Sequence, residues 1–147
     1  METLVINKSI AIEATAQKIW EVLFQDKFNR IWYAEFSPGT YAITDWQEGS
    51  KVVFLDNSNS GIIGKVFESN PFKTLSLEYT GILVNGVEDY DTEDAHALKG
   101  GREIYNLESE DDNIRLTIIG DMAEQYYEAM SRSWENALLK IKELAEN

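Results

Sequence analysis

The sequence of 147 residues contains no cysteine. Disulfide bonds, thiolate nucleophiles and cysteine-ligated zinc sites are therefore excluded. Histidine occurs once, at His96. A metal site would need carboxylates such as Asp91, Glu93 and Asp94 as further ligands, and a Ser-His-Asp triad would need a serine in a nucleophile-elbow context, which is missing. An exposed loop histidine is the better interpretation, and we predict no catalytic residue, no metal site and no cofactor.

Long apolar segments are missing too. No run approaches the roughly 18 apolar residues of a membrane helix, and the N-terminus has no basic region followed by an apolar stretch, as a signal peptide would. We therefore expect a cytoplasmic protein with no membrane partner. Because 44% of the residues are apolar and the length is that of one domain, we predict a single soluble domain over residues 1–147.

Acidic residues outnumber basic ones by 26 to 13, which gives a formal net charge of −13. A field of this sign repels phosphate backbones and anionic lipid surfaces, so nucleic acid is not an expected partner. The charge would suit a basic protein partner, although solubility alone is a sufficient explanation. The densest acidic stretch, residues 88–94, is typical of a solvated loop that could also bind a cation or a basic partner.

Periodicity predicts the elements of the first third of the chain. Apolar and polar residues alternate over 3–13, as in a half-buried strand. Thr15 can cap a helix over 16–24, where apolar residues follow helical spacing. A second helical segment is expected over 27–32, and Pro38-Gly39 ends it.

Strands and turns dominate the following residues. The expected strands cover residues 40–46, 51–55, 62–68, 74–80, 102–108 and 114–119. Residues 81–101 interrupt the alternation, and we expect a long excursion there. After Gly120, Asp121 and Glu124 form a capping-box pattern, and apolar residues then recur at three- and four-residue steps up to Leu144. This pattern predicts one long C-terminal helix.

This order of elements predicts an α+β fold, with a curved antiparallel sheet of about seven strands around the long C-terminal helix and two short helices after the first strand. The expected helix carries large, flexible side chains where tight packing would favour smaller ones. A cavity between sheet and helix is therefore expected, and such concave, mostly apolar spaces bind small ligands.

Two residues of one predicted strand stand out as candidate chemistry. Alternation places Glu103 and Tyr105 on the face expected to meet the helix, with Tyr79 on the same face of a neighbouring strand. A carboxylate in an apolar cavity would have a raised pKa and could act as an acid or a base. From the sequence alone, the favoured alternative is that Glu103 points to solvent or pairs with Arg102 or Lys65.

Aromatic residues and methionines are expected to complete the ligand site, although most aromatic residues in a small domain belong to its core. The candidate ligand-binding residues are Trp32, Phe36, Phe54, Phe67, Tyr79, Glu103, Tyr105, Met122, Tyr126, Met130 and Trp134.

Several short segments, in their order along the chain, resemble one protein superfamily. They are residues 10–14, 19–23, 36–39, 46–50, 75–79, 103–105 and 134–140, together with Trp32 and Pro71. In these segments the chain resembles the START-like (SRPBCC) superfamily and, within it, the homologues of the activator of heat-shock-protein ATPase. The resemblance implies a helix-grip fold with a pocket between helix and sheet.

Members of this superfamily include lipid carriers, polyketide cyclases and plant hormone-binding proteins, so the fold alone does not determine the chemistry. The leading hypothesis is a non-enzymatic domain that binds a small hydrophobic or lipid-like molecule. The resemblance also implies a second function, a chaperone-associated protein-interaction module. A third is a cyclase- or hydrolase-like enzyme that uses Glu103 and Tyr105 as acid and base.

Overall fold

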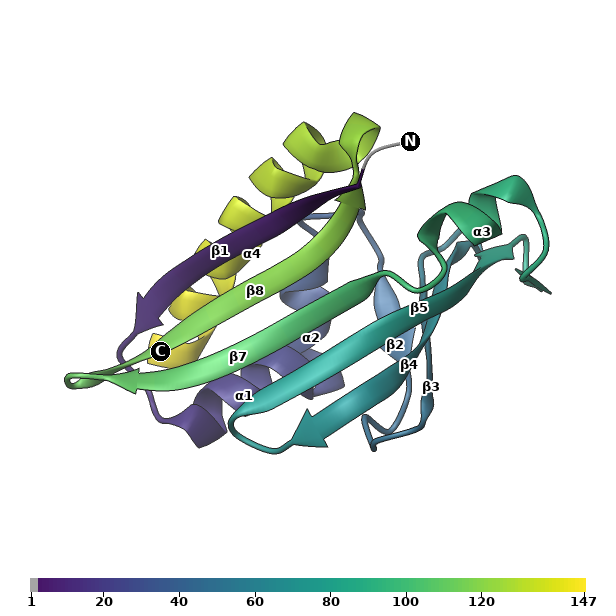
Figure 1. Cartoon of the computed structure of the whole chain (residues 1–147). Coiled ribbons are helices and arrows are strands. Elements are labelled where there is room, and N and C mark those ends of the chain that lie inside the picture. Colours follow the sequence, from purple (N-terminus) through teal and green to yellow (C-terminus); the bar gives the residue numbers. More distant parts are fainter. Residues whose placement is uncertain (1–2) are drawn as a thin grey trace.

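The computed structural model describes residues 3–147, and it has the predicted α+β architecture (Figure 1). The strands are β1 (Thr3–Ile12), β2 (Tyr41–Ile43), β3 (Lys51–Leu55), β4 (Gly61–Asn70), β5 (Thr74–Val84), β6 (Val87–Asp89), β7 (Arg102–Glu110) and β8 (Asn113–Ala123). The helices are α1 (Ala16–Phe24), α2 (Asp26–Tyr33), α3 (Glu93–Leu98), the 3-10 turn η1 (Glu124–Tyr126) and α4 (Tyr127–Glu146).

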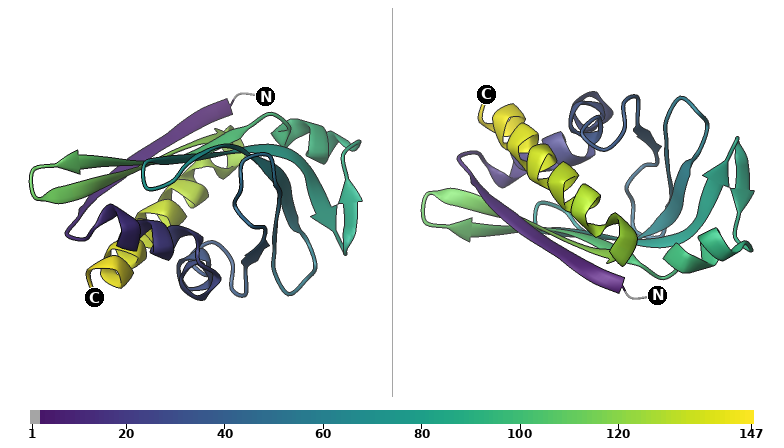
Figure 2. Two further views of the ribbon diagram at one scale, coloured as in Figure 1. Left: turned by 90° about the horizontal axis from the view of Figure 1, so that it is seen from below. Right: turned by 90° about the horizontal axis from the view of Figure 1, so that it is seen from above.

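The strands of residues 3–147 form one antiparallel sheet of eight strands, in the order β1-β8-β7-β5-β4-β3-β2, with β6 paired to β5. The pairing of β4 with β5 shifts register between Ile63 and Gly64 and again between Val66 and Glu68. Such bulges bend strands and increase their twist. The sheet is accordingly curved, and Figure 2 shows α1, α2 and α4 on the same side of it.

The two short helices form where the sequence predicts them. The Thr15 side chain accepts a hydrogen bond from the amide of Lys18 at 3.1 Å and so caps α1. Ile19, Val22 and Leu23 then project from one side of α1 and are fully buried. Burying a side chain of this kind stabilises the fold by about 1.5–3 kcal/mol. The face of α1 that the apolar spacing defines is thus the face that packs on the sheet.

The long helix α4 packs through one apolar stripe, which consists of Trp134, Ala137, Leu138, Ile141 and Ala145. The stripe belongs to the main hydrophobic core, together with residues of β1, β5, β7 and β8. This arrangement of helix and sheet confirms the predicted fold class. No helix within residues 3–147 has the length and apolar character needed to cross a membrane.

The predicted start of the long helix is wrong. Asp121 and Met122 belong to β8, which continues to Ala123 and pairs with β1 over its last residues. The Asp121 carboxylate accepts a hydrogen bond from the backbone amide of Arg102 at 3.0 Å, so it serves the neighbouring strand rather than a helix end. Continued pairing with β1 outweighs the local capping signal, and α4 begins only at Tyr127.

Two further boundaries differ from the prediction. The strand expected over 40–46 is limited to β2, because Trp46 has a left-handed φ of 60° and the Thr44 hydroxyl accepts the Trp46 amide, which forms a turn. The excursion expected over 81–101 contains the end of β5, the hairpin strand β6 and helix α3. Thr92 caps α3 by accepting the amide of Ala95, and Asp89 in turn accepts the Thr92 hydroxyl at 2.7 Å.

Candidate functional site

The candidate site lies on the face of the sheet that α1, α2 and α4 cover, here called the helix-side face. Glu103 and Tyr105 of β7 point to this face, since the Tyr105 ring contacts Trp134 of α4 at a centroid distance of 6.1 Å. Glu103 lies opposite Leu77 of β5 on one side and opposite Gly120 of β8 on the other. The centre of the sheet therefore presents a carboxylate to the space below α4.

Two tyrosine hydroxyl groups donate hydrogen bonds to the Glu103 carboxylate. The Tyr79 hydroxyl lies 2.9 Å from Oε1, and the Tyr105 hydroxyl lies 2.6 Å from Oε2. Tyr105 is buried, whereas Tyr79 and Glu103 are each partly exposed. The alternative that the sequence favoured for Glu103 is wrong, because its alternation with Tyr105 turns it to the helix side.

Burial controls the ionisation of this cluster. Loss of solvent raises the pKa of Glu103, and the hydrogen bonds from Tyr105 and Tyr79 oppose that rise by favouring the carboxylate. Burial, reinforced by the nearby Glu103 charge, raises the pKa of both phenols well above the usual value. Tyr33 of α2 behaves in the same way, with burial as the main cause and Glu103 as the next. At neutral pH all three tyrosines therefore remain hydrogen-bond donors.

Arg102, the residue before Glu103, points to the opposite face of the sheet. Its Nη2 lies 3.3 Å from a carboxylate oxygen of Glu78, and its guanidinium carbon lies 3.7 Å from the centre of the Phe67 ring. Phe67 is 44% exposed there. It comes next to the bulge after Val66, where β4 turns its side chain outward. The structure thus places Phe67 away from the helix-side face.

Four of the aromatic candidates form a connected cluster under α4, namely Trp32, Phe36, Phe54 and Trp134. Trp134 contacts Phe36, with ring centroids 4.8 Å apart, and Trp32, with centroids 5.9 Å apart. Trp32 is buried, and its indole nitrogen donates to the Val22 carbonyl at 2.9 Å, so it serves the core. Phe54 is partly buried and contacts Tyr33 at 6.0 Å.

The three candidates near the start of α4 are distributed differently. Met122 lies in β8 and Met130 in α4, and both are partly buried against the main core. Tyr126 lies in η1, and 55% of its surface is exposed. The two methionines can therefore line the helix-side space, while Tyr126 lies at the surface. The flexible thioether chains can adapt to neighbours of different shape.

Room for a side chain remains beside Glu103, at Gly120. Gly120 is buried in β8, and its position in the alternation with Ile118 and Met122 turns its α-carbon to the helix side. A β-carbon at this position would have a single atom within 4 Å, the Arg102 carbonyl oxygen at 3.9 Å. Protein interiors are normally close-packed, so a buried position with so few neighbours marks a gap in the packing.

Sequence reasoning missed Gly120 as a site residue because it treated this glycine as the end of a strand. The alternation of Leu116 and Ile118 continues through Gly120 to Met122, and that signal could have identified the glycine as an inward position. Phe24 and Tyr33 were also missed. Phe24 contacts the Tyr105 ring at 5.4 Å, a neighbour that only the packing of α1 on the sheet determines.

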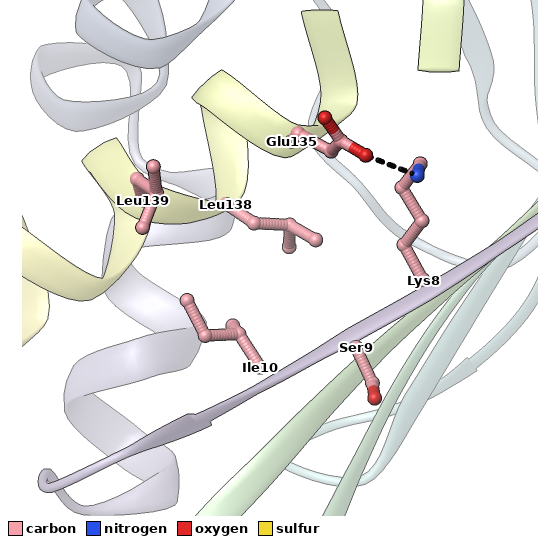
Figure 3. A pocket seen from close by; sticks show the side chains of 6 residues that line it. All are labelled: Lys8, Ser9, Ile10, Glu135, Leu138 and Leu139. Atoms are coloured by element: carbon pink, nitrogen blue, oxygen red, sulfur yellow. Dashed lines mark hydrogen bonds and ion pairs between the residues drawn. The ribbon is translucent and has the colours of Figure 1, made fainter. Parts of the chain in front are cut away.

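Two open pockets lie elsewhere on the surface. One, of about 350 Å³, lies between β1 and α4, where Lys8 and Ile10 point toward the helix and Lys8 pairs with Glu135 at 2.8 Å (Figure 3). The other, of about 400 Å³, adjoins β2 and β3 at Ile43 and Val53. Neither contains a predicted ligand residue.

His96, the one histidine, is exposed on α3.

Comparison with solved structures shows which proteins share this fold. The Aha1 protein of Colwellia psychrerythraea, solved as a dimer, is 19% identical, and the match covers 97% of this chain and 96% of that chain with a TM-score of 0.71. Protein Ms6760 of Mycobacterium smegmatis is 14% identical over 96% of this chain and 90% of its own, with a TM-score of 0.72.

CalU16 of Micromonospora echinospora is similar as well, with 16% identity, coverage of 97% of this chain and 75% of that chain, and a TM-score of 0.64. No protein-family model and no curated protein sequence matches the chain. The chain shares the fold of these structures, a curved antiparallel sheet with a long C-terminal helix, which agrees with the predicted fold class.

Proposed function

We propose that this protein binds a small hydrophobic or lipid-like molecule, without chemical turnover, between the helix-side face of the sheet and α4. The observation that carries the proposal is the open space at Gly120 next to the Glu103 carboxylate. Ligand sites are usually apolar spaces with a few fixed polar groups, and Glu103 with its two tyrosine donors would supply the polar groups here.

Partial exposure supports an entry route to that space. Phe54, Met122 and Met130 are each partly accessible although they pack on the main core. Rotation of the methionine side chains would widen the space without moving the backbone, since thioether chains change rotamer readily. A ligand would then replace protein–solvent contacts with apolar contacts, and Tyr79 and Glu103 would orient its polar end.

The proposal is tested by filling the space. Gly120→Leu would place a side chain where the ligand is expected, and Thr117→Leu would enlarge a side chain of the same strand that points to the opposite face. The measurement is the rise in melting temperature with a panel of hydrophobic metabolites, because a ligand that binds only the folded state stabilises it.

We expect panel members to stabilise the wild-type protein and Thr117→Leu, but not Gly120→Leu. If Gly120→Leu does not fold, Gly120→Ala provides the same test with one added methyl group, and weaker binding is expected. The proposal is wrong if no panel member stabilises the wild type, or if Gly120→Leu binds as tightly as the wild type does.

A second candidate function follows from the structural similarity to an Aha1 protein. In that case the chain would be a chaperone-associated interaction module, and its net charge of −13 would favour a basic partner surface. Stimulation of a heat-shock-protein ATPase by the purified chain, with no ligand-induced stabilisation by the panel, would favour this function over ligand binding.

A further inference from the structure

Glu103 is a partly buried carboxylate for which the described residues, 3–147, provide no cation. None of the ion pairs formed within residues 3–147 includes it. Arg102, its neighbour in sequence, is bound to Glu78 and Phe67 on the other face of the sheet. Buried charges in proteins are normally paired, because an unpaired one loses its hydration without compensation. Among the described residues, Glu103 thus lacks the cationic partner that such a group usually has.

The hydrogen bonds from Tyr79 and Tyr105 compensate this charge only in part. Each carboxylate oxygen accepts one hydrogen bond from a phenol hydroxyl, but both donors are neutral, so they do not cancel the negative charge of the ionised carboxylate. An oxygen of a carboxylate has room for a further donor beside the first. The open position at Gly120 lies directly across the strand pair from Glu103, so a donor could approach from there.

Glu103 is held by two tyrosines, one of which belongs to a larger aromatic cluster. The Tyr105 ring contacts Phe24 at 5.4 Å and Trp134 at 6.1 Å, and Trp134 contacts Phe36 at 4.8 Å. The faces of aromatic rings attract organic cations, and apolar substituents on such a cation gain from the same surface. The protein as a whole also carries 13 excess negative charges, which raise the local concentration of cations.

We propose that the ligand is an organic cation with an apolar body, such as an alkyl- or arylammonium compound, whose charged group lies against Glu103. This inference rests on the proposed ligand-binding function and specifies its substrate class. It excludes fatty acids and other hydrophobic anions, because their carboxylate would lie next to that of Glu103. The body of the ligand would extend from the space at Gly120 toward Trp134.

The experiment compares three probes with the same chain length, octylammonium, octanol and octanoate, each well below its micelle concentration. Dissociation constants are measured by calorimetry at pH 7 and fixed ionic strength. Glu103→Gln removes the proposed counter-charge. Glu78→Gln is the matched control, since it removes the same charge from the adjacent strand on the opposite face of the sheet.

We expect the wild-type protein to bind octylammonium at least tenfold more tightly than octanol, with octanoate the weakest of the three. In Glu103→Gln the preference should disappear, so that the dissociation constants of octylammonium and octanol become about equal. Glu78→Gln should retain the wild-type preference. Ethylammonium, which has the charge without the body, should bind at least tenfold more weakly than octylammonium.

The inference is overturned if wild-type protein binds octanol or octanoate as tightly as octylammonium, or if Glu103→Gln keeps the preference. In those cases the proposed ligand-binding function would still stand, because a hydrophobic probe would have bound. If none of the three probes binds, the cation inference and the proposed function both fail.

Discussion

At the scale of single residues, Glu103 is the group whose environment departs most from that of an ordinary surface glutamate. Its carboxylate accepts two phenol hydrogen bonds at 2.6 and 2.9 Å, and one of the donors, Tyr105, packs against Phe24 and Trp134. Burial raises its pKa, and the phenols limit that rise. Stability and ionisation are therefore linked at this residue.

The pH dependence of stability should reveal this linkage. Because the pKa of Glu103 is higher in the folded state than in the unfolded state, the folded protein binds the proton more tightly. The contribution of Glu103 to the free energy of unfolding is therefore fully present below the unfolded pKa of about 4.3 and decreases as the pH rises through the folded pKa. Relative to Glu103→Gln, the wild-type protein should become more stable as the pH falls from about 7 toward about 4.

Urea denaturation of the wild type and Glu103→Gln across this pH range measures the effect. Glu108→Gln, an exposed position of the same strand, controls for the loss of one charge. A stability difference between wild type and Glu103→Gln that stays constant with pH, or that grows in the opposite direction, would contradict the prediction.

Removal of one phenol hydroxyl should change the ionisation of Glu103. Tyr105→Phe keeps the ring contacts with Phe24 and Trp134 but removes the hydrogen bond of 2.6 Å, which lowers the carboxylate pKa. We expect the pKa of Glu103 to rise in this variant. The side-chain carboxyl carbon can be followed by NMR during a pH titration, and Tyr41→Phe, outside the cluster, should leave the titration unchanged. An unchanged or lower Glu103 pKa in Tyr105→Phe would show that this phenol does not stabilise the carboxylate.

At the scale of secondary-structure elements, the sheet contains glycines for two different physical reasons. Gly61, where β4 begins opposite the end of β3, leaves no room for a side chain, since a β-carbon there would lie 1.7 Å from the Phe54 carbonyl oxygen. Gly120 in β8 leaves room, because a β-carbon there would lie 3.9 Å from the Arg102 carbonyl oxygen, its one neighbour within 4 Å. The first glycine is needed for close strand approach, and the second keeps a space open beside Glu103.

This difference predicts opposite results for the same substitution. Gly61→Ala should lower the free energy of unfolding by about 2–3 kcal/mol, because the rigid backbone of β3 has to move. Gly120→Ala should raise it by about 0.5–1 kcal/mol, because alanine loses less conformational entropy in a strand than glycine does. Urea denaturation of the wild type and both variants measures these changes in the free energy of unfolding. Equal destabilisation by the two substitutions would show that the position beside Glu103 is filled.

At the scale of the whole molecule, charge is unbalanced while the core is well formed. The excess of 13 acidic residues creates self-repulsion that favours an expanded chain. The ion pairs do little to offset it, since most of them, such as Arg30 with Asp26 and Lys140 with Glu143, are exposed at the surface. Pairs of this kind contribute about 0–1 kcal/mol each.

Salt should therefore stabilise this protein. Raising the ionic strength from about 0.01 M to about 0.15 M shortens the screening length from about 30 Å to about 8 Å and weakens repulsion between distant charges. We expect the melting temperature to rise over this range in sodium chloride. Sucrose at matched osmolality controls for effects other than screening, and a melting temperature that falls with salt would mean that the attractive pairs outweigh the overall repulsion.

Much of the fold could be predicted from local patterns. The alternation of Leu75, Leu77 and Tyr79 defined the helix-side face of β5, and the Thr15 cap gave the start of α1. The same alternation brought Glu103 and Tyr105 to one face. The start of α4 was not predictable in this way, because a capping box at Asp121 is a local signal and the pairing of β8 with β1 is not.

At the candidate site, too, some features follow from local sequence patterns and others only from the tertiary structure. The sequence by itself determined the α+β class, the absence of thiol chemistry and the acidic charge, because composition and period-two alternation are properties of the chain. Alternation offered the helix-side face for Glu103, but the sequence alone favoured an exposed or ion-paired carboxylate. Only the tertiary structure decided that Glu103 has tyrosine partners and no cationic partner among residues 3–147, that Phe67 stacks with Arg102 on the far face, and that space remains at Gly120. These features depend on strand register and on bulges, which bring together residues far apart in the chain.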